Sequence, residues 1–202
     1  QRADALLGLE DMDEARRWAE TALRSIDDGH TPPTNHTATL ARILNKLGRA
    51  DDAYRIGHGR IEESQGWWDA LAIAQSSFHA GRHTQALVEL DAILERWPEF
   101  HYAFRWQAII LCELGRLAEA EKAIEQALAL QGRNPDFLLT HAQILSEMQR
   151  HEPALARSLA AVAMKPDLRR AHHFASAYAV SADKPGTAIA QLAWLLNHGP
   201  RY

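Results

Sequence analysis

Alanine recurs along the chain at a nearly constant spacing and forms the centre of a repeated pattern of apolar positions. The recurring alanines are Ala15, Ala53, Ala86, Ala120, Ala154 and Ala188, separated by 38, 33, 34, 34 and 34 residues. A small side chain at such regular steps indicates a structural unit that is repeated along the chain.

Further small and apolar residues keep fixed distances from these alanines. Eight residues after each alanine stands an aliphatic residue: Leu23, Ile61, Leu94, Leu128, Val162 and Leu196. Twelve residues before each alanine from Ala53 onward stands a small residue: Ala41, Ala74, Ala108, Ala142 and Ser176. Proline follows three of the alanines by twelve residues, as Pro98, Pro166 and Pro200.

Pairs of closely packed antiparallel helices explain this arrangement. The small residues before and after a turn let the two helices approach, and the aliphatic residue lies two turns further along the same face. Proline ends a unit because it cannot continue a helix. Glycine tolerates left-handed backbone angles and marks the turn in three units, at Gly48, Gly81 and Gly115. The pattern predicts no strand and helices over 2–9, 12–27, 34–47, 50–64, 67–80, 83–96, 101–114, 117–131, 135–148, 152–164, 169–182 and 185–197.

A period of 34 residues with alanine, small residues and proline at these offsets resembles the tetratricopeptide repeat. The fullest match covers residues 104–111, 115–120 and 127–130, and the resemblance extends over nearly the whole chain. It implies an all-α fold, a right-handed α-solenoid of about six antiparallel helix pairs. It also implies a single array over 1–202, with repeats near 1–33, 34–66, 67–100, 101–134, 135–168 and 169–202. We expect the first repeat to be truncated, since Gln1 falls inside its first helix. The missing initiator methionine suggests a fragment or a processed chain.

Several residues depart from the repeat. Arg60 stands where the family favours alanine. Gly57 and Gly59 weaken the helix expected over 50–64, by about 1 kcal/mol each relative to alanine. Gln149 and Asp183 replace the turn glycine in the last two units.

The resemblance also implies a binding surface, because in the family the first helix of each pair lines a concave groove. Carrying over the groove positions one at a time gives a candidate site for a partner: Arg42, Lys46, Trp68, Leu71, Gln75, Phe78, Tyr102, Arg105, Ile109, Leu139, Gln143, Arg170 and His173. Bulky apolar residues in such a surface are typical of an interaction site. We therefore expect the partner to be another protein, a peptide or helical segment with a bulky apolar residue, with an acidic group near Arg42, Lys46 and Arg105. In the alternative interpretation, Trp68 and Phe78 pack between adjacent helix pairs, because a register error of one residue turns a side chain by about 100°.

Composition is that of an ordinary folded chain and narrows the function classes. Apolar residues make up 47% of the 202 residues, and the net charge of -4 comes without a basic block that would indicate nucleic-acid binding. No apolar stretch is long enough for a membrane span. Cys112 is the only cysteine, which rules out an intramolecular disulfide and slightly favours the cytoplasm.

The residues that carry catalysis or bind metals do not form recognisable patterns. His172 and His173 are adjacent and point in different directions on a helix, and the turn at Gly81 separates His79 from His83. His141 has no histidine or cysteine at ligand spacing. Nucleophile elbows, phosphate loops and dinucleotide fingerprints are missing. We expect no enzyme activity, no cofactor and no metal.

Two other roles remain open. The chain resembles accessory repeat domains of bacterial glycosyl- or sulfotransferases, which recruit substrate or mediate oligomerisation. Self-association through the last helix is the other role. Ile189, Leu192, Trp194, Leu195 and Leu196 would give that helix an apolar end face without a polar capping helix after it.

Overall fold

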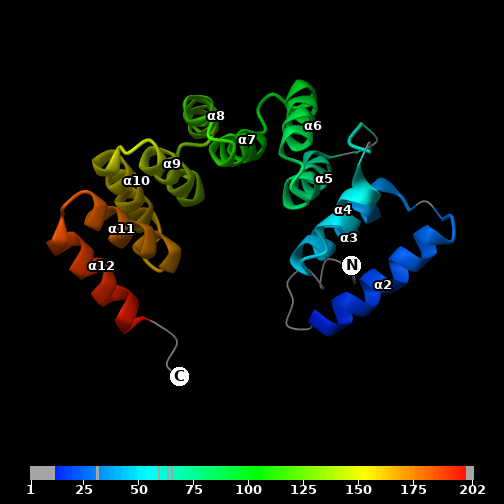
Figure 1. The fold of residues 1–202 in the computed structure, drawn as a ribbon, viewed down its shortest axis with the longest axis horizontal. Helices are drawn as coiled ribbons and strands as arrows, with labels where there is room; N and C mark the ends of the chain where they lie inside the picture. The colour runs from blue at the N-terminus through cyan, green and yellow to red at the C-terminus, as the bar shows by residue number, and fades with distance from the viewer. Residues whose placement is uncertain (1–11, 31, 59, 63, 65, 199–202) are drawn as a thin grey trace. The chain divides into compact units, whose positions relative to one another are not determined.

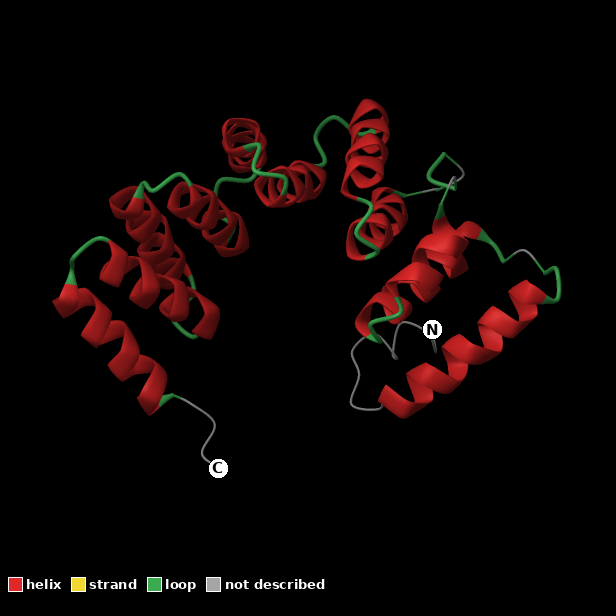
Figure 2. Ribbon diagram, in the orientation of Figure 1, coloured by secondary structure: helices red, strands yellow, loops and turns green. Residues whose placement is uncertain are grey.

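The computed structural model describes residues 12–30, 32–58, 60–62, 64 and 66–198, and every regular element among them is an α-helix (Figures 1 and 2). These helices are α2 (Met12–Asp27), α3 (Thr34–Lys46), α4 (Ala50–Gly57), α5 (Trp67–His79), α6 (His83–Arg96), α7 (His101–Glu113), α8 (Leu117–Leu130), α9 (Pro135–Glu147), α10 (His151–Met164), α11 (Arg169–Ser181) and α12 (Pro185–Asn197). The prediction of an all-α chain is confirmed. The helix predicted over 2–9 lies outside the described residues.

The chain divides into two compact units, Gln1–Phe100 and His101–Tyr202. In the first unit, α3 packs against α4 and α5 against α6, while α2 lies against α3. In the second unit the pairs are α7 with α8, α9 with α10, and α11 with α12 (Figure 1). In the second unit, neighbouring pairs are joined mainly by contacts of a second helix with the first helix that follows, as α8 contacts α9 and α10 contacts α11. In the first unit, α5 contacts both α3 and α4.

The recurring alanines lie at the centres of these pairs, as the spacing predicts. Ala53, Ala86, Ala120 and Ala154 are fully buried. The small residues twelve positions earlier, from Ala41 to Ser176, are buried as well. A larger side chain at either position would overlap the facing helix, because packed interiors leave no room for an extra methylene group.

The turns inside the pairs share one left-handed residue. Gly48, Gly81 and Gly115 have φ angles of 72°, 74° and 73°. Gln149 and Asp183, at the equivalent positions of the last two pairs, keep this conformation with φ angles of 61° and 54°. The backbone geometry of the repeat is therefore retained at two residues that adopt it at a steric cost.

The second helix of the second repeat is shorter than predicted. A helix was expected over 50–64, but α4 ends at Gly57 and His58 leaves the helical region with φ -55° and ψ 131°. Gly57 lies against α5, where an added Cβ would come within 3.1 Å of Ile73 Cγ2. Glycine is a weak helix former, and at position 57 it also allows the close approach of α4 to α5. The end of α4 at this residue is consistent with both properties.

Arg60 connects the segment that follows α4 to the start of α3 by hydrogen bonds. Its guanidinium donates hydrogen bonds to Thr37 Oγ1 at 2.7 Å and to the Pro32 carbonyl oxygen at 3.0 Å. Ile61, the aliphatic position of this repeat, is still buried although it is no longer helical. The arginine at a position where alanine was expected thus links the loop after α4 to the start of α3.

Candidate functional site

In the first unit, α3 and α5 bring several of the expected partner-binding residues to one cleft. Arg42, Asn45 and Lys46 of α3 line it together with Gln75 and His79 of α5, and the cleft has a volume of about 300 Å³. Arg42, Lys46 and Gln75 belong to the candidate site. Asn45 and His79 were left out of that set although they occupy groove positions of the same helices.

Two polar atoms in the wall of this cleft lack a protein partner. Arg42 Nε and Asn45 Oδ1 are buried and make no hydrogen bond. The rest of each side chain is anchored, because Arg42 Nη2 donates to Thr39 Oγ1 at 3.2 Å and Asn45 Nδ2 donates to Ser76 Oγ at 3.1 Å. A donor and an acceptor held in place without partners fit a ligand that offers both kinds of group, as a peptide does.

The charge of the cleft is mainly positive. Arg42 and Lys46 supply two cations, and the carboxylate of Asp69 lies 3.9 Å from Arg42 Nη2. At 3.9 Å these two atoms form an ion pair but are too far apart for a hydrogen bond. An anionic group would therefore be attracted to the α3 side of the cleft.

Aromatic residues at the start of α5 form a half-exposed surface. Trp68 is 48% exposed, and the edge of its ring meets Phe100 with centroids 5.3 Å apart. Trp67 stacks on the same Phe100 at 5.2 Å. Contact with the buried Phe100 holds both indoles in place and leaves part of each ring accessible. Trp68 therefore both packs against the interior, as one interpretation of the sequence expected, and presents an accessible surface, as the groove interpretation expected.

Other candidate residues of α5 are less accessible. Leu71 is 2% exposed and lies in the interior of the repeat. Phe78 is half-buried and stacks on His83 of α6 with centroids 5.3 Å apart. Leu71 thus leaves no surface for a partner, and Phe78 offers only part of its ring.

In the second unit, candidate residues of three successive first helices are linked by polar contacts. Arg105 Nε of α7 donates to Thr140 Oγ1 of α9 at 3.0 Å. Arg170 of α11 pairs with Asp136 of α9. Burial lowers the pKa of Arg105, and the nearby Asp136 opposes that shift. These two arginines are largely engaged in contacts within the unit.

The apolar candidates of the second unit differ in exposure. Tyr102 is half-buried with its ring edge-on to Phe137 at 5.2 Å, and Ile109 is half-buried too. Leu139 is 1% exposed and belongs to the core of its repeat. Gln143 and His173 are exposed. As with Leu71, burial of Leu139 removes it from the accessible surface.

Cys112 and Ser77 are of residue types that serve as nucleophiles in enzymes, but their surroundings differ from those of activated nucleophiles. Burial and the nearby Glu147 raise the pKa of Cys112, which keeps the thiol protonated rather than nucleophilic. Ser77 Oγ donates to Glu89 Oε2 at 2.5 Å, and His58 Nδ1 lies 3.5 Å from the other carboxylate oxygen. The serine therefore bonds to the carboxylate and not to the imidazole, which differs from the order of a serine–histidine–acid triad.

In the part of the chain that the structure describes, no helix has both the length and the apolar character needed to cross a membrane.

Comparison with known proteins finds similarity of fold among solved structures but no match in sequence to a family model or to a curated protein. The solved structures that it resembles include a thermophilic TPR protein of Thermus thermophilus, with a TM-score of 0.71 and 19% identity over 83% of this chain and 92% of that one. MamA from Desulfovibrio magneticus superposes with a TM-score of 0.67 at 13% identity, covering 84% of this chain and 97% of the other. The C-terminal part of a TPR repeat-containing protein from Cytophaga hutchinsonii gives 0.67 at 13% identity, covering 98% and 78%.

Proposed function

Since the chain has the all-α solenoid fold of tetratricopeptide-repeat proteins, we propose that it is a non-enzymatic scaffold that binds a segment of another protein on the face formed by its first helices. The fold supplies a rigid surface of helix faces, and function on such a fold resides in the side chains that this surface presents. Under this proposal the six repeats predicted from the sequence serve together as one array.

The cleft between α3 and α5 is the observation that carries the proposal. It combines two cations, a buried unpaired donor and a buried unpaired acceptor, all on the helices that were expected to contact a partner. Satisfying the two unpaired atoms would recover free energy that the unbound protein forgoes. The partner segment accordingly carries an acidic side chain, and its backbone or a side-chain amide contacts Arg42 Nε and Asn45 Oδ1.

Trp68 adds an apolar contact at a defined distance from this cleft. It precedes Gln75 by seven residues on α5, which corresponds to about 10 Å along the helix axis. An extended peptide spans that distance with about three residues. The proposed ligand is therefore a segment with a bulky apolar residue about three positions from an acidic one.

Binding measurements on designed variants test this proposal. The partner would first be identified by affinity capture from the native cell, and its binding segment would then be synthesised with a fluorescent label. We expect Arg42→Glu with Lys46→Glu, and separately Trp68→Ala, to weaken binding at least tenfold. Val88→Ala, at an exposed apolar position of α6, is the control and should bind as the unaltered protein does. Unchanged affinity in both the Arg42/Lys46 and the Trp68 variants, with helix content preserved, would refute the proposed site.

Self-association through α12 is a second candidate function, favoured by its exposed residues. Ile189, Leu192 and Leu196 are 67%, 47% and 84% exposed. Their spacing of three and four residues places them on one stripe of the helix. A stripe of this kind pairs readily with its own copy in a twofold dimer.

Sedimentation equilibrium distinguishes this second role. We expect a concentration-dependent dimer that Leu192→Glu with Leu196→Glu converts to a monomer, whereas Val88→Glu leaves it intact. A monomeric mass for the unaltered protein at millimolar concentration would eliminate this candidate without affecting the α3–α5 site.

A further inference from the structure

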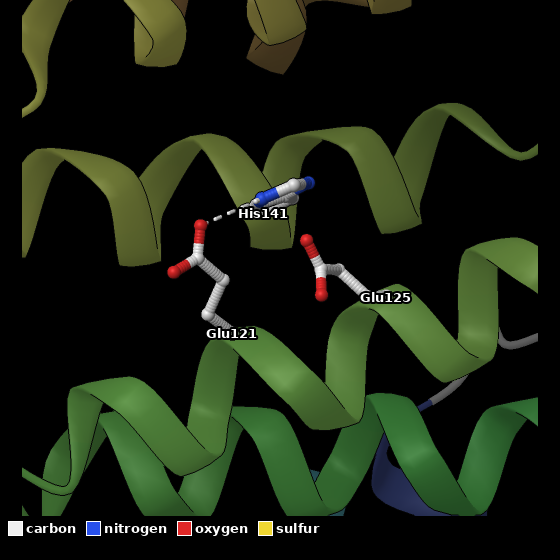
Figure 3. A group of neighbouring side chains, drawn as sticks. All are labelled: Glu121, Glu125 and His141. Carbon is white, nitrogen blue, oxygen red and sulfur yellow. Dashed lines mark ion pairs between the residues drawn. The ribbon is translucent and has the colours of Figure 1, made fainter.

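Three potential ligand groups meet where the fourth and fifth predicted repeats join in the second unit. Glu121 and Glu125 lie one turn apart on α8 and point toward His141 on α9 (Figure 3). One ligand atom from each residue lies within 4.8 Å of the others. His141 Nε2 is 3.8 Å from Glu121 Oε1, which is too long for a hydrogen bond.

His141 is the unusual member of this group. The residue is only 3% exposed, and neither ring nitrogen has a hydrogen-bond partner in the protein. Buried polar groups normally have a partner, because leaving one without costs folding free energy. A buried imidazole that faces two carboxylates without bonding to them leaves room for an atom between them.

We propose that Glu121, Glu125 and His141 bind a divalent transition-metal ion, with Zn²⁺ as the best fit, and that the ion clamps α8 to α9. One imidazole nitrogen and two carboxylate oxygens are a donor set that zinc accepts in proteins. The carboxylates of Glu121 and Glu125 balance the charge of the ion. Three protein ligands leave a fourth position for water, since Glu125 is exposed and the site opens to solvent on its side.

The surroundings keep the imidazole in the form that binds metals. Burial and the positive charge of Arg157 lower the pKa of His141 below its ordinary value, whereas Glu121 and Glu125 act in the opposite direction. The net direction leaves the ring neutral at neutral pH, with a lone pair available to an ion.

Arg150 competes for one of the carboxylates. Its Nη1 donates to Glu121 Oε1 at 2.6 Å, and about half of its side chain is exposed. Oε1 is also the Glu121 oxygen that lies 3.8 Å from His141 Nε2, so an ion would share this oxygen with the arginine unless Arg150 turns into solvent. Arg150 should therefore weaken metal binding without preventing it.

Small side-chain motions are sufficient to close the site. Donor atoms around a tetrahedral zinc ion are about 3.4 Å apart, given bonds of about 2.0–2.1 Å. Moving from the present separations to that distance requires shifts of about 1 Å, which rotations of the two glutamate side chains supply without moving either helix.

Calorimetric titration with ZnCl₂ of the full chain, first stripped with a chelator, tests the site. We expect the unaltered protein to bind one equivalent of Zn²⁺ more than the double variant Glu121→Gln with Glu125→Gln. With zinc at about 100 times its dissociation constant, the clamp should raise the melting temperature by about 5 °C, and the double variant should lack this rise. Glu119→Gln, at an exposed carboxylate of the same helix, is the matched control and should keep both effects.

Several other histidines of the chain could bind zinc weakly, so the difference between variants carries the conclusion. Glutamine preserves the shape of glutamate, and the double variant should therefore fold even if His141→Asn does not. Co²⁺ gives a second readout, because its visible absorption is much stronger in a four-coordinate site than in a six-coordinate one. We expect this strong absorption in the unaltered protein and in Glu119→Gln, and its loss in the glutamine double variant. Equal stoichiometry and an equal thermal shift in the unaltered protein and the glutamine double variant would overturn the proposal, as would the absence of any binding by the unaltered protein.

Discussion

The imidazole of His172 lies flat on the indole of Trp194, with ring centroids 3.6 Å apart and an interplanar angle of 4°. Both ring nitrogens of His172 are engaged as well, with Nε2 2.8 Å from the Pro166 carbonyl oxygen and Nδ1 2.6 Å from the Gln191 side-chain oxygen. His198 stacks on the same indole at 4.3 Å. These contacts join α11 to α12 and to the loop between α10 and α11 through one buried histidine.

Removing either ring should destabilise the last helix pair. We expect His172→Ala and Trp194→Ala each to lower the free energy of unfolding by about 2–4 kcal/mol, because each deletes a packed ring. The double variant should lose less than the sum by about 1 kcal/mol, which is the coupling of a stacked pair. Urea denaturation of the four proteins gives this cycle. Strict additivity would show that the stack contributes nothing beyond burial.

The left-handed turn residues predict a gain in stability. Gln149→Gly and Asp183→Gly should each raise the free energy of unfolding by about 1 kcal/mol, because glycine adopts these angles without a steric cost. Gly115→Ala at the equivalent position, with φ of 73°, is the converse control and should destabilise by a similar amount. Thermal and urea denaturation measure both changes. A loss of stability in both glycine variants would mean that their side chains contribute contacts outweighing the strain.

The buried carboxylate of Glu89 predicts a large effect in the first unit. It is 5% exposed and accepts hydrogen bonds from Ser77 Oγ and, at 3.1 Å, from Gln85 Nε2. We expect Glu89→Ala to cost about 3 kcal/mol, since it deletes packing and leaves the buried serine hydroxyl without its acceptor. Ser77→Ala should cost less, about 1–2 kcal/mol, because it deletes less packing and Gln85 still donates to the other carboxylate oxygen. Equal costs in urea denaturation would argue against this assignment.

Tyr178 predicts a pH dependence at the alkaline end. Burial, with smaller contributions from Glu147 and Cys112, raises the pKa of its hydroxyl to about 12. The unfolded chain loses that proton near pH 10, so the stabilising effect of Tyr178 is complete below pH 10 and is lost as the pH rises toward 12. The stability of the unaltered protein should fall relative to Tyr178→Phe across this window. Ultraviolet absorbance should show a tyrosine ionisation near pH 12 that is absent from Tyr178→Phe. A parallel decline in the stability of both proteins would contradict the assignment.

Much of the fold follows from the sequence because its period is strict. The observed bounds of α2, α3 and the helices from α5 to α12 agree with those predicted to within a residue. The exception is α4, where the repeat pattern continued to Ile61 and the two glycines at 57 and 59 were counted as weakening the helix rather than ending it. A pattern of apolar positions shows where a segment is buried, and Ile61 is buried, but it does not show whether the backbone between such positions stays helical.

The candidate site could be predicted only in part. Transfer of repeat positions placed Arg42, Lys46 and Gln75 correctly on a shared cleft, because spacing alone determines which helix face they occupy. The transfer of positions did not distinguish exposed from buried members of the set. Leu71 and Leu139 are buried because their apolar side chains pack into the interior of the repeat. The group around His141 was missed, since its carboxylates lie on a different helix and a search for histidine or cysteine spacing along the sequence does not detect them. Two glutamates four residues apart on the face toward the next repeat were the available signal.

Cys112 has a practical consequence for experiments. Its thiol is half-buried and has a raised pKa, so little thiolate is present at neutral pH and alkylating reagents should react with it slowly. A cysteine introduced at an exposed position such as Gln143 would be modified before Cys112. A fluorophore could therefore be attached at position 143 without first replacing Cys112. We therefore expect selective labelling at the introduced cysteine to be possible. Binding of a partner could then be followed by a change in the fluorescence emission of the label.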